Sequence, residues 1–357
     1  MRYRDLGNTG LKVSEISFGT IPVLSGDVPV LPDYFSLNED EAISVMEYAY
    51  NLGCNLFDTA IVPEYGDAEI KLGKFAAHIG RENIIISDKS RFFDGNEMYK
   101  AVLESCKNLD SYSDIYFIHQ VDEGNEDVTF GKYGAVDALI ELKAEGRIRF
   151  TGIASHYYGI LLRGAKDSRV DVLQGSGNIF ERGMLDQIES EIAFRQKGFI
   201  LNKVYAAGIL PSFFPVKTLI SGVLSYPVSS ALIGIGTSEQ ADQALKEPEN
   251  YGRPSFSEVM SVLEKSFVPI PCDRCQRCRC IYGTEIHILL RQYNYYFLGK
   301  DYWALRKLDM SINESASQCK KCTEMSCMKN CPKAINIPES IQMIKRLVEI
   351  HIRNSRI

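Results

Sequence analysis

Short apolar segments rich in β-branched and aromatic residues recur along the first two thirds of the chain. Each ends at or near a polar residue or a glycine, and the stretches between them carry apolar residues at helical spacing. From residue 13 to residue 230 the segments begin 31 positions apart on average, the length of a strand, a helix and two loops. We expect eight strands, over residues 13–18, 54–58, 83–89, 114–119, 150–155, 170–174, 198–203 and 230–235.

Alternating strands and helices indicate parallel strands joined by helical crossovers. Eight such repeats close most naturally into an α/β fold of the (β/α)8 TIM-barrel type. An open doubly wound sheet is the structural alternative, but the first strand is not followed by a GxGxxG fingerprint. Before that strand, RYRDLGNTGLKV predicts an N-terminal hairpin with Gly7, Asn8 and Gly10 in its turn, placed to close the N-terminal mouth of the barrel.

The composition is that of a folded globular protein, with 45% hydrophobic residues among 357 and a net charge of −6, so nucleic-acid binding is not expected. Eight of the ten cysteines lie in the last quarter. The chain shows neither a secretion signal nor an apolar run of membrane length, so we expect a cytoplasmic protein with no membrane partner. Clustered thiols then indicate a metal site rather than disulfides. We predict two domains, residues 1–268 for the barrel and 269–357 for a metal-binding module.

Four polar side chains lie where neighbouring strands end, the edge at which barrels of this kind place their active sites. Asp58, Lys89 and His119 end the second, third and fourth predicted strands, and Tyr65 follows the second. A tyrosine hydroxyl with its usual pKa of about 10 is a slow proton donor, and a neighbouring lysine would lower that pKa. Asp58 would hold Lys89, and His119 would orient a carbonyl oxygen. The set contains no nucleophile, so a hydride cofactor fits it.

The segments that carry these residues, FDTAxxxEYGDAEIKLG, IISDKS, YFIHQVD and GIASH, resemble the aldo-keto reductase family. The resemblance implies the barrel, a catalytic tetrad of Asp58, Tyr65, Lys89 and His119 with Tyr65 as general acid, and NADP(H) or NAD(H) as cofactor. It also implies a set of cofactor-binding positions along the strand ends, namely Gly19, Thr20, Ser155, His156, Gln174, Lys203, Gly234, Thr237 and Gln240.

The choice of nicotinamide cofactor stays open in the sequence. Ala244 replaces an asparagine that is typical of the family, and Gly236 stands where a basic residue for the 2′-phosphate of NADPH is expected. Neither Lys nor Arg occurs from Thr218 to Leu245. NADPH is the family default and NADH the alternative. Lys203 and Tyr205 follow the family pattern only loosely.

The C-terminal cysteines form two motifs, CxxCxxCxC and CxxCxxxxCxxxCP. They look like ferredoxin motifs, in which three thiolates bind one [4Fe–4S] cluster and the fourth binds the other. One branch of the family carries such a domain, so we expect a small, mostly α-helical ferredoxin-like domain with two clusters. Two zinc sites, or a single cluster, remain open because the first motif is shortened and lacks a proline. The ligand sets would be Cys272, Cys275, Cys278 and Cys331, and Cys280, Cys319, Cys322 and Cys327.

Charge separates the two predicted domains. Residues 271–357 contain 15 Lys and Arg against 8 Asp and Glu, a net charge of +7, whereas residues 1–270 carry −13. The basic residues compensate thiolate-bound clusters, or they form a docking face for an acidic partner, which is either the barrel itself or an acidic electron carrier. We expect an NAD(P)H-dependent oxidoreductase that interconverts a small carbonyl compound and its alcohol. The alternative is an electron-transfer or redox-sensing interaction protein that uses the barrel as a scaffold.

Overall fold

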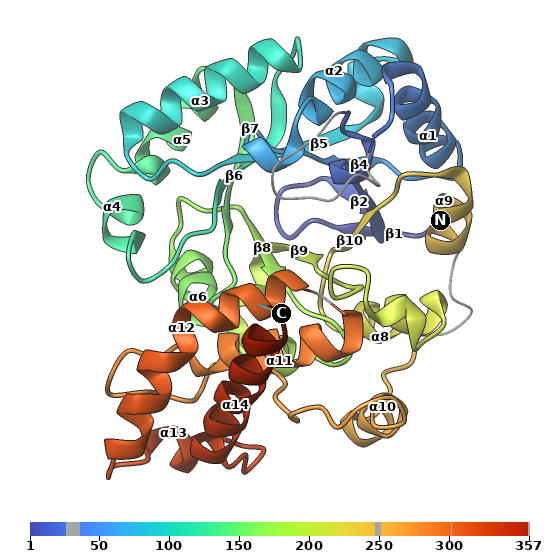
Figure 1. Cartoon of the computed structure of the whole chain (residues 1–357). Coiled ribbons are helices and arrows are strands. Elements are labelled where there is room, and N and C mark those ends of the chain that lie inside the picture. The colour runs from blue at the N-terminus through green and yellow to red at the C-terminus, as the bar shows by residue number, and fades with distance from the viewer. Residues whose placement is uncertain (26–35, 247–250, 301, 356–357) are drawn as a thin grey trace. The chain divides into compact units, whose positions relative to one another are not determined.

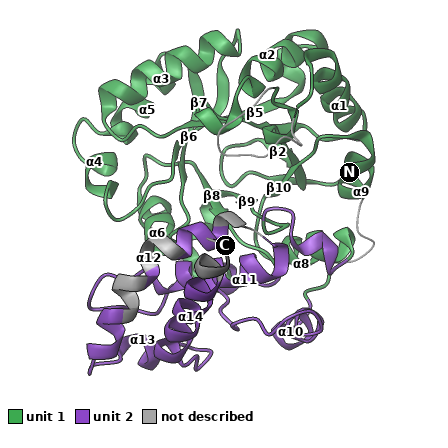
Figure 2. Cartoon of the chain, in the orientation of Figure 1, with its two compact units in different colours: residues 1–178, 188–206, 215–253 green, residues 179–187, 207–214, 254–357 purple. Residues whose placement is uncertain are grey.

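The computed structural model of the chain describes residues 1–25, 36–246, 251–300 and 302–355. It divides into two compact units, shown in different colours in Figure 2. Unit 1 comprises residues 1–178, 188–206 and 215–253, and unit 2 comprises residues 179–187, 207–214 and 254–357. This division differs from the expected boundary after residue 268. Two segments that follow barrel strands, and the helix at residues 256–263, belong to the same unit as the cysteine-rich segment, because residues far apart in the chain contact one another there.

Unit 1 contains a closed barrel of eight parallel strands, as the recurrence predicts (Figure 1). Around the barrel the order is β10-β3-β4-β5-β6-β7-β8-β9. Every predicted strand overlaps an observed one. The first barrel strand begins later than expected, because Val13 and Ser14 belong to the second strand of the N-terminal hairpin. The strands are β3 (Ile16–Gly19), β4 (Leu56–Asp58), β5 (Ile85–Ser90), β6 (Ser113–His119), β7 (Ile148–Ala154), β8 (Val172–Ser176), β9 (Gly198–Asn202) and β10 (Ser230–Gly234).

Helices connect the strands and cover the barrel. Side chains cap several of them where the sequence supplies an Asn, Asp or Thr. Asn38 and Glu41 form a capping box at the start of α1, and Asp94 accepts two backbone N–H bonds at the start of α3. The helices are α1 (Glu39–Asn51), α2 (Ala68–Ile79), α3 (Gly95–Asn108), α4 (Glu126–Phe130), α5 (Ala135–Ala144), α6 (Tyr158–Lys166), α7 (Gly183–Ser190), α8 (Val216–Leu224) and α9 (Ser238–Leu245); α7 begins in unit 2 and ends in unit 1.

The N-terminal hairpin pairs β1 (Tyr3–Asp5) with β2 (Lys12–Ser14), as predicted. Its turn residue Leu6 is fully buried in a cluster with apolar residues of the barrel strands, among them Leu56 and Val172, the first residues of β4 and β8, so the hairpin covers the N-terminal mouth. Gly7 lies against the start of β9, with φ +53 and a backbone bridge to Lys197. A Cβ atom there would come within 2.2 Å of the Gly198 nitrogen, so only glycine fits this close approach.

Unit 2 is helical, with α10 (Phe256–Leu263), α11 (Ile286–Gly299), α12 (Tyr302–Lys321), α13 (Ser326–Lys329) and α14 (Ile337–Ser355) (Figure 1). Its core is an aliphatic cluster from α11, α12 and α14, against which several cysteines pack. The mostly helical character agrees with the expectation. Its ferredoxin-like nature stays a prediction. None of the described helices has the length and apolar character that crossing a membrane requires.

Candidate active site and cysteine cavities

The barrel brings the four predicted catalytic residues to the carboxyl ends of three adjacent strands. Asp58 is the last residue of β4, Lys89 the second-last of β5 and His119 the last of β6. These strands are direct neighbours in the parallel sheet. Tyr65 ends a short 3-10 helix, Pro63–Tyr65, in the connection after β4. The strand order therefore explains how residues 61 positions apart in the chain reach one edge.

Asp58 and Lys89 form a fully buried ion pair. Lys89 Nζ contacts Asp58 Oδ1 and also donates to the Thr59 carbonyl oxygen at 2.7 Å. The second Asp58 oxygen accepts bonds from Ser87 Oγ at 2.7 Å and Gln174 Nε2 at 3.0 Å. Burial by itself lowers the pKa of Lys89, but the Asp58 carboxylate and the interaction with Tyr65 outweigh it, and the pKa lies above its usual value. Lys89 is therefore a fixed cation.

The Lys89 ammonium lies over the ring of Tyr65, with Nζ 5.0 Å from the ring centroid. Burial raises the pKa of Tyr65, Lys89 lowers it and Asp58 raises it, and the sum lies above the usual value of a tyrosine. We expected Lys89 to bring this pKa toward neutral pH. Its influence has the expected sign, but burial and Asp58 outweigh it, so Tyr65 holds its proton in the ligand-free chain.

His119 is a neutral imidazole. Burial lowers its pKa to about 2, with further contributions from the Lys89 and Arg91 cations. Its Nδ1 atom is buried and has no hydrogen-bond partner among the described residues. A neutral imidazole carries one donor and one acceptor nitrogen. His119 can thus offer a hydrogen bond to a bound polar atom without carrying charge.

Some of the predicted cofactor-binding side chains form hydrogen bonds within the protein, and others have polar atoms with no hydrogen-bond partner among the described residues. The hydroxyl of Thr20 donates to the Asp58 carbonyl oxygen at 3.0 Å, and that of Ser155 to the Val121 carbonyl oxygen at 2.6 Å. His156 Nδ1 lies 3.0 Å from Ser176 Oγ. These contacts fix the strand ends. Gly19, at the end of β3, lies beside Asp58, because the two residues are paired in the register of β3 and β4.

Farther around the barrel, Lys203 follows β9 in a left-handed conformation, φ +61. Gly234 ends β10. Thr237 caps α9 by accepting a bond from the Gln240 backbone N–H at 3.2 Å, and the Gln240 side chain accepts from Gly236 at 2.8 Å. A helix begins after this turn, as predicted. Two backbone N–H groups of the turn already donate to side chains of the turn itself.

Several buried polar atoms at or after strand ends have no partner among the described residues. Gln174 uses its amide nitrogen on Asp58, and its Oε1 stays open. Asn202 Oδ1, at the end of β9, and the Tyr205 hydroxyl are open as well. Burial raises the pKa of Tyr205, so this hydroxyl is a neutral donor. Ser87 and Asn202 were not among the predicted site residues, although the position of Asn202 at a strand end is a signal that could have found it.

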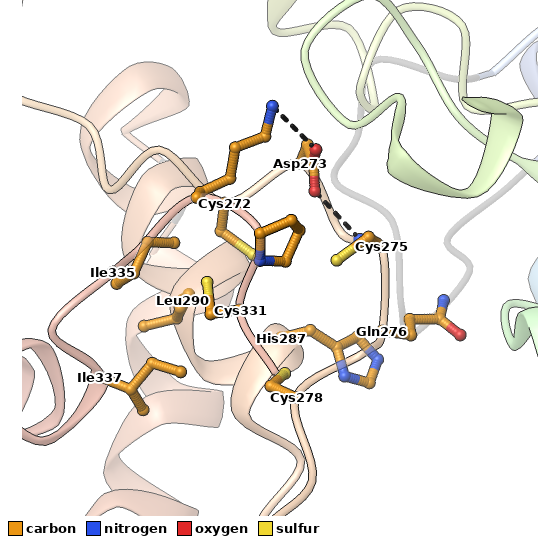
Figure 3. A pocket seen from close by; sticks show the side chains of 12 residues that line it. Cys272, Asp273, Cys275, Gln276, Cys278, His287, Leu290, Cys331, Ile335 and Ile337 are labelled. Carbon is orange, nitrogen blue, oxygen red and sulfur yellow. Dashed lines mark hydrogen bonds and ion pairs between the residues drawn. The ribbon is translucent and has the colours of Figure 1, made fainter. Parts of the chain in front are cut away.

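In unit 2, eight cysteines line two cavities, four in each. The first cavity is lined by Cys272, Cys275, Cys278 and Cys331, together with His287 and the apolar Leu290, Ile335 and Ile337 (Figure 3). The second is lined by Cys280, Cys319, Cys322 and Cys327. These are the two sets of four expected from the ferredoxin-like motifs.

All ten cysteines are free thiols. Burial raises the pKa of Cys272 and brings that of Cys278 to about 11, so both keep their protons in the ligand-free chain. Within the described residues, no three His, Cys, Asp or Glu side chains converge closely enough to hold a single metal ion. The donor chemistry of each cavity is nevertheless that of a four-thiolate site.

Comparison with known proteins gives a consistent match for the barrel. The model of the aldo/keto reductase family matches residues 15–208, more than half of the chain. The L-galactose dehydrogenase of Arabidopsis thaliana is 29% identical over 311 residues, which cover 73% of this chain and 94% of the relative. A crystal structure from Pseudomonas aeruginosa, described as an aldo-keto reductase, is 26% identical with a TM-score of 0.60, covering 69% of this chain and 94% of that one. The holo form of an aldo-keto reductase from Bacillus halodurans, 21% identical with a TM-score of 0.59 over 74% of this chain and 96% of its own, shares the fold.

Proposed function

Because the chain belongs to the aldo/keto reductase family of oxidoreductases, we propose that it interconverts a small carbonyl compound and its alcohol, with Tyr65 as the general acid. The observation that carries this proposal is the buried Asp58–Lys89 pair beneath the Tyr65 ring, next to a neutral His119. A bound nicotinamide dinucleotide, NADP(H) or NAD(H), supplies or accepts the hydride.

The proton chemistry follows from this arrangement. When the substrate oxygen gains negative charge, Tyr65 Oη gives it a proton, and the Lys89 cation stabilises the phenolate that remains. Asp58 keeps Lys89 charged and in place, because Ser87 and Gln174 hold the other carboxylate oxygen. His119 donates a hydrogen bond to the substrate oxygen and orients it. In the alcohol-oxidising direction, the same groups act in reverse and Tyr65 takes up the proton.

The residues present fit a nicotinamide cofactor. The unpartnered atoms of Gln174 and Asn202 are two amide oxygens, both acceptors, which suit the two N–H donors of a carboxamide. Ser155 and His156 lie at the end of β7 beside Gln174, with the Ser155 nitrogen bonded to the Gln174 carbonyl oxygen at 3.0 Å. Gly19 and Thr20, Lys203, Gly234, Thr237 and Gln240 complete the proposed cofactor-binding set.

A Tyr65→Phe variant tests the proposed role. Removal of a general acid lowers the rate by about 10²- to 10⁴-fold, so kcat for reduction of a panel of aldehydes and ketones should fall by at least 10². Binding of NADPH and NADH, followed by nicotinamide fluorescence, should stay within about twofold. The control is Tyr99→Phe, which removes a surface hydroxyl that donates to Glu145. Lost cofactor binding in the Tyr65 variant would contradict the role given to this residue.

The second part of the proposal is that the two cysteine cavities hold [4Fe–4S] clusters. Four thiols around each cavity, lined also by aliphatic side chains such as Ile337, match the ligation and the apolar surroundings of such clusters. Clustered free thiols also belong in a reducing compartment, so a cytoplasmic location is part of the proposal. Anaerobic purification followed by iron and sulfide analysis should give about eight of each per chain. Zinc without iron would refute it.

A second function is favoured by one observation, the presence of two four-cysteine cavities in a unit distinct from the barrel. If the iron-loaded protein bound neither NADPH nor NADH and reduced no carbonyl compound, we would assign it as an electron-transfer or redox-sensing protein with the barrel as scaffold. Hydride transfer moves two electrons at once whereas a cluster exchanges one, so the two activities are separable in assays.

A further inference from the structure

The two cysteine cavities of unit 2 have different surroundings. Beside the first cavity, the polar residues Asp273, Arg274 and His287 are buried, and Arg274 pairs with the buried Glu181. Arg277 and Pro332 beside that cavity are exposed, but the exposed residues beside the second cavity include large apolar side chains as well as cations. Arg279, Ile281 and Tyr282 line this cavity from the segment after the first motif, and Lys320, Lys321 and Met325 lie between its cysteines in the second motif.

We call the six residues Arg279, Ile281, Tyr282, Lys320, Lys321 and Met325 the rim of the second cavity. Its two segments are joined directly, since Ser326 Oγ donates to the Arg279 carbonyl oxygen at 3.1 Å. The rim has the character of a recognition surface. Its apolar members Ile281, Tyr282 and Met325 are 50%, 43% and 44% exposed, and all three basic members are exposed too. Exposed aromatic and Met side chains among cations are typical of protein interfaces.

Charge indicates the kind of partner. The ionisable residues of the segment 271–357 give it a net charge of +7, more than the negative charge that two thiolate-bound clusters would add, in a chain whose net charge is −6. The rim contributes three cations, and the only acidic residue within its second segment is Glu324. A basic, partly apolar surface of this kind attracts an acidic protein and accelerates its association at low salt.

The two cavities of unit 2 adjoin each other. Ile337, at the start of α14, lines both cavities and is 1% exposed, so the two cavities share a buried apolar wall residue. Two one-electron centres at these places would share this apolar wall. The second cavity is the one flanked by exposed apolar and cationic side chains together.

We propose that the rim of the second cavity docks an acidic one-electron carrier protein, and that electrons enter and leave the chain there. This inference rests on the proposed clusters. In the forward step the carrier's centre loses one electron and the iron–sulfur site at the second cavity gains it. No covalent bond forms or breaks, and no proton needs to move.

The test uses the iron-loaded full-length protein and a purified acidic [2Fe–2S] ferredoxin as the probe. Binding is measured by calorimetry at several salt concentrations, and a zero-length carbodiimide cross-linker joins lysines to the carboxylates of the probe. We expect binding that weakens with salt and cross-links at Lys320 and Lys321. The double variant Lys320→Glu with Lys321→Glu should weaken binding about tenfold or more.

A matched control separates local from overall charge. Lys100→Glu with Lys107→Glu, both exposed on α3, changes the net charge by the same amount and should leave binding unchanged. Because Lys320 and Lys321 adjoin two cysteines, iron content is measured for every variant. Should the charge reversal lose iron, the neutral pair Lys320→Gln with Lys321→Gln, and Tyr282→Ala, replace it, and weaker binding is expected for each.

The outcomes distinguish the inference from its premise. A protein that carries no iron ends the proposed clusters and this inference with them. A fully loaded protein that ignores the ferredoxin, or that loses affinity equally in the α3 control, overturns the inference alone. Binding to anionic phospholipid vesicles in place of the ferredoxin would overturn it too, by assigning the rim to a membrane surface.

Discussion

The buried Asp58–Lys89 pair makes a quantitative prediction for the variant Asp58→Asn. The two side chains are 0% and 2% exposed, so the substitution leaves a buried ammonium without its counter-charge. It also creates an amide N–H that must face either Lys89 or the two donors Ser87 and Gln174. Breaking a buried pair in this way costs about 3 to 5 kcal/mol of unfolding free energy.

The effect should be large enough to see by thermal unfolding. In a domain of this size, each kcal/mol shifts Tm by roughly 2 to 4 °C, so we expect Asp58→Asn to lower Tm by about 6 to 20 °C. The control is Asp5→Asn, which breaks the pair between Asp5 and Lys12. Those two side chains are 71% and 70% exposed, and the loss should stay below about 1 kcal/mol.

A double variant separates stability from catalysis. Asp58→Asn with Lys89→Met removes both charges at nearly the same volume, and should recover most of the stability lost in the single variant. Reductase activity should be lost in the double variant, which has no cation to stabilise the Tyr65 phenolate, and lowered in the single variant, whose Lys89 is no longer held by Asp58. If the single variant unfolds within 1 kcal/mol of the parent, or if the double variant is no more stable than the single one, the pair is not a buried charge pair and the reasoning fails.

Two further predictions concern His119 and the cysteines. The pKa of His119 is about 2 in the folded chain and about 6.5 in the unfolded chain, so only the unfolded state binds an extra proton as the pH drops below 6.5. The unfolding free energy of the parent should therefore fall by up to about 1.4 kcal/mol per pH unit because of this group. In denaturant unfolding between pH 6.5 and 4.5, the unfolding free energy of His119→Gln should fall by about 2 to 3 kcal/mol less than that of the parent. An equal slope in parent and variant would contradict the buried neutral imidazole. Cys331→Ser should reduce bound iron by about half, with Cys106→Ser as the control that keeps it; unchanged iron in Cys331→Ser would place the cluster ligand elsewhere.

The sequence carried enough information for the barrel and for the convergence of the proposed catalytic residues, because both depend on local patterns. Strand, helix and turn recur at a regular interval, and parallel strands then bring their carboxyl ends to one edge. Asp58, Lys89 and His119 each end a strand or nearly do, so the topology alone brings them together. The two sets of cysteines that line the cavities likewise follow from motif spacing and from the likeness to ferredoxins.

What the sequence did not provide depends on non-local geometry. Gln174 was expected to contact the nicotinamide, but its amide nitrogen holds Asp58, 116 positions away, and only its oxygen is open. The support from Ser87 could not be predicted, since it arises from side chains on two adjacent strands that point into the same space. The net pKa of Tyr65 depends on complete burial, and no motif reports burial. The grouping of residues 179–187 and 207–214 with the C-terminal segment is non-local in the same sense.

The buried charges and unpartnered polar atoms of the barrel site do not stabilise the fold, so the stability of the fold does not explain why they are there. A buried ion pair is about as stable as a well-packed apolar pair of the same volume or less so, and each open buried polar atom costs about 1 to 3 kcal/mol. His119, Gln174, Asn202 and Tyr205 all carry such atoms, in an interior where most polar groups are paired. A polar ligand that completes these hydrogen bonds, as ordered water can also do, recovers the costs. We therefore expect NADPH or NADH to raise the Tm of the parent more than that of a Gln174→Leu, Asn202→Leu variant, which retains the fold but lacks two of the open atoms; an equal shift would place the cofactor elsewhere.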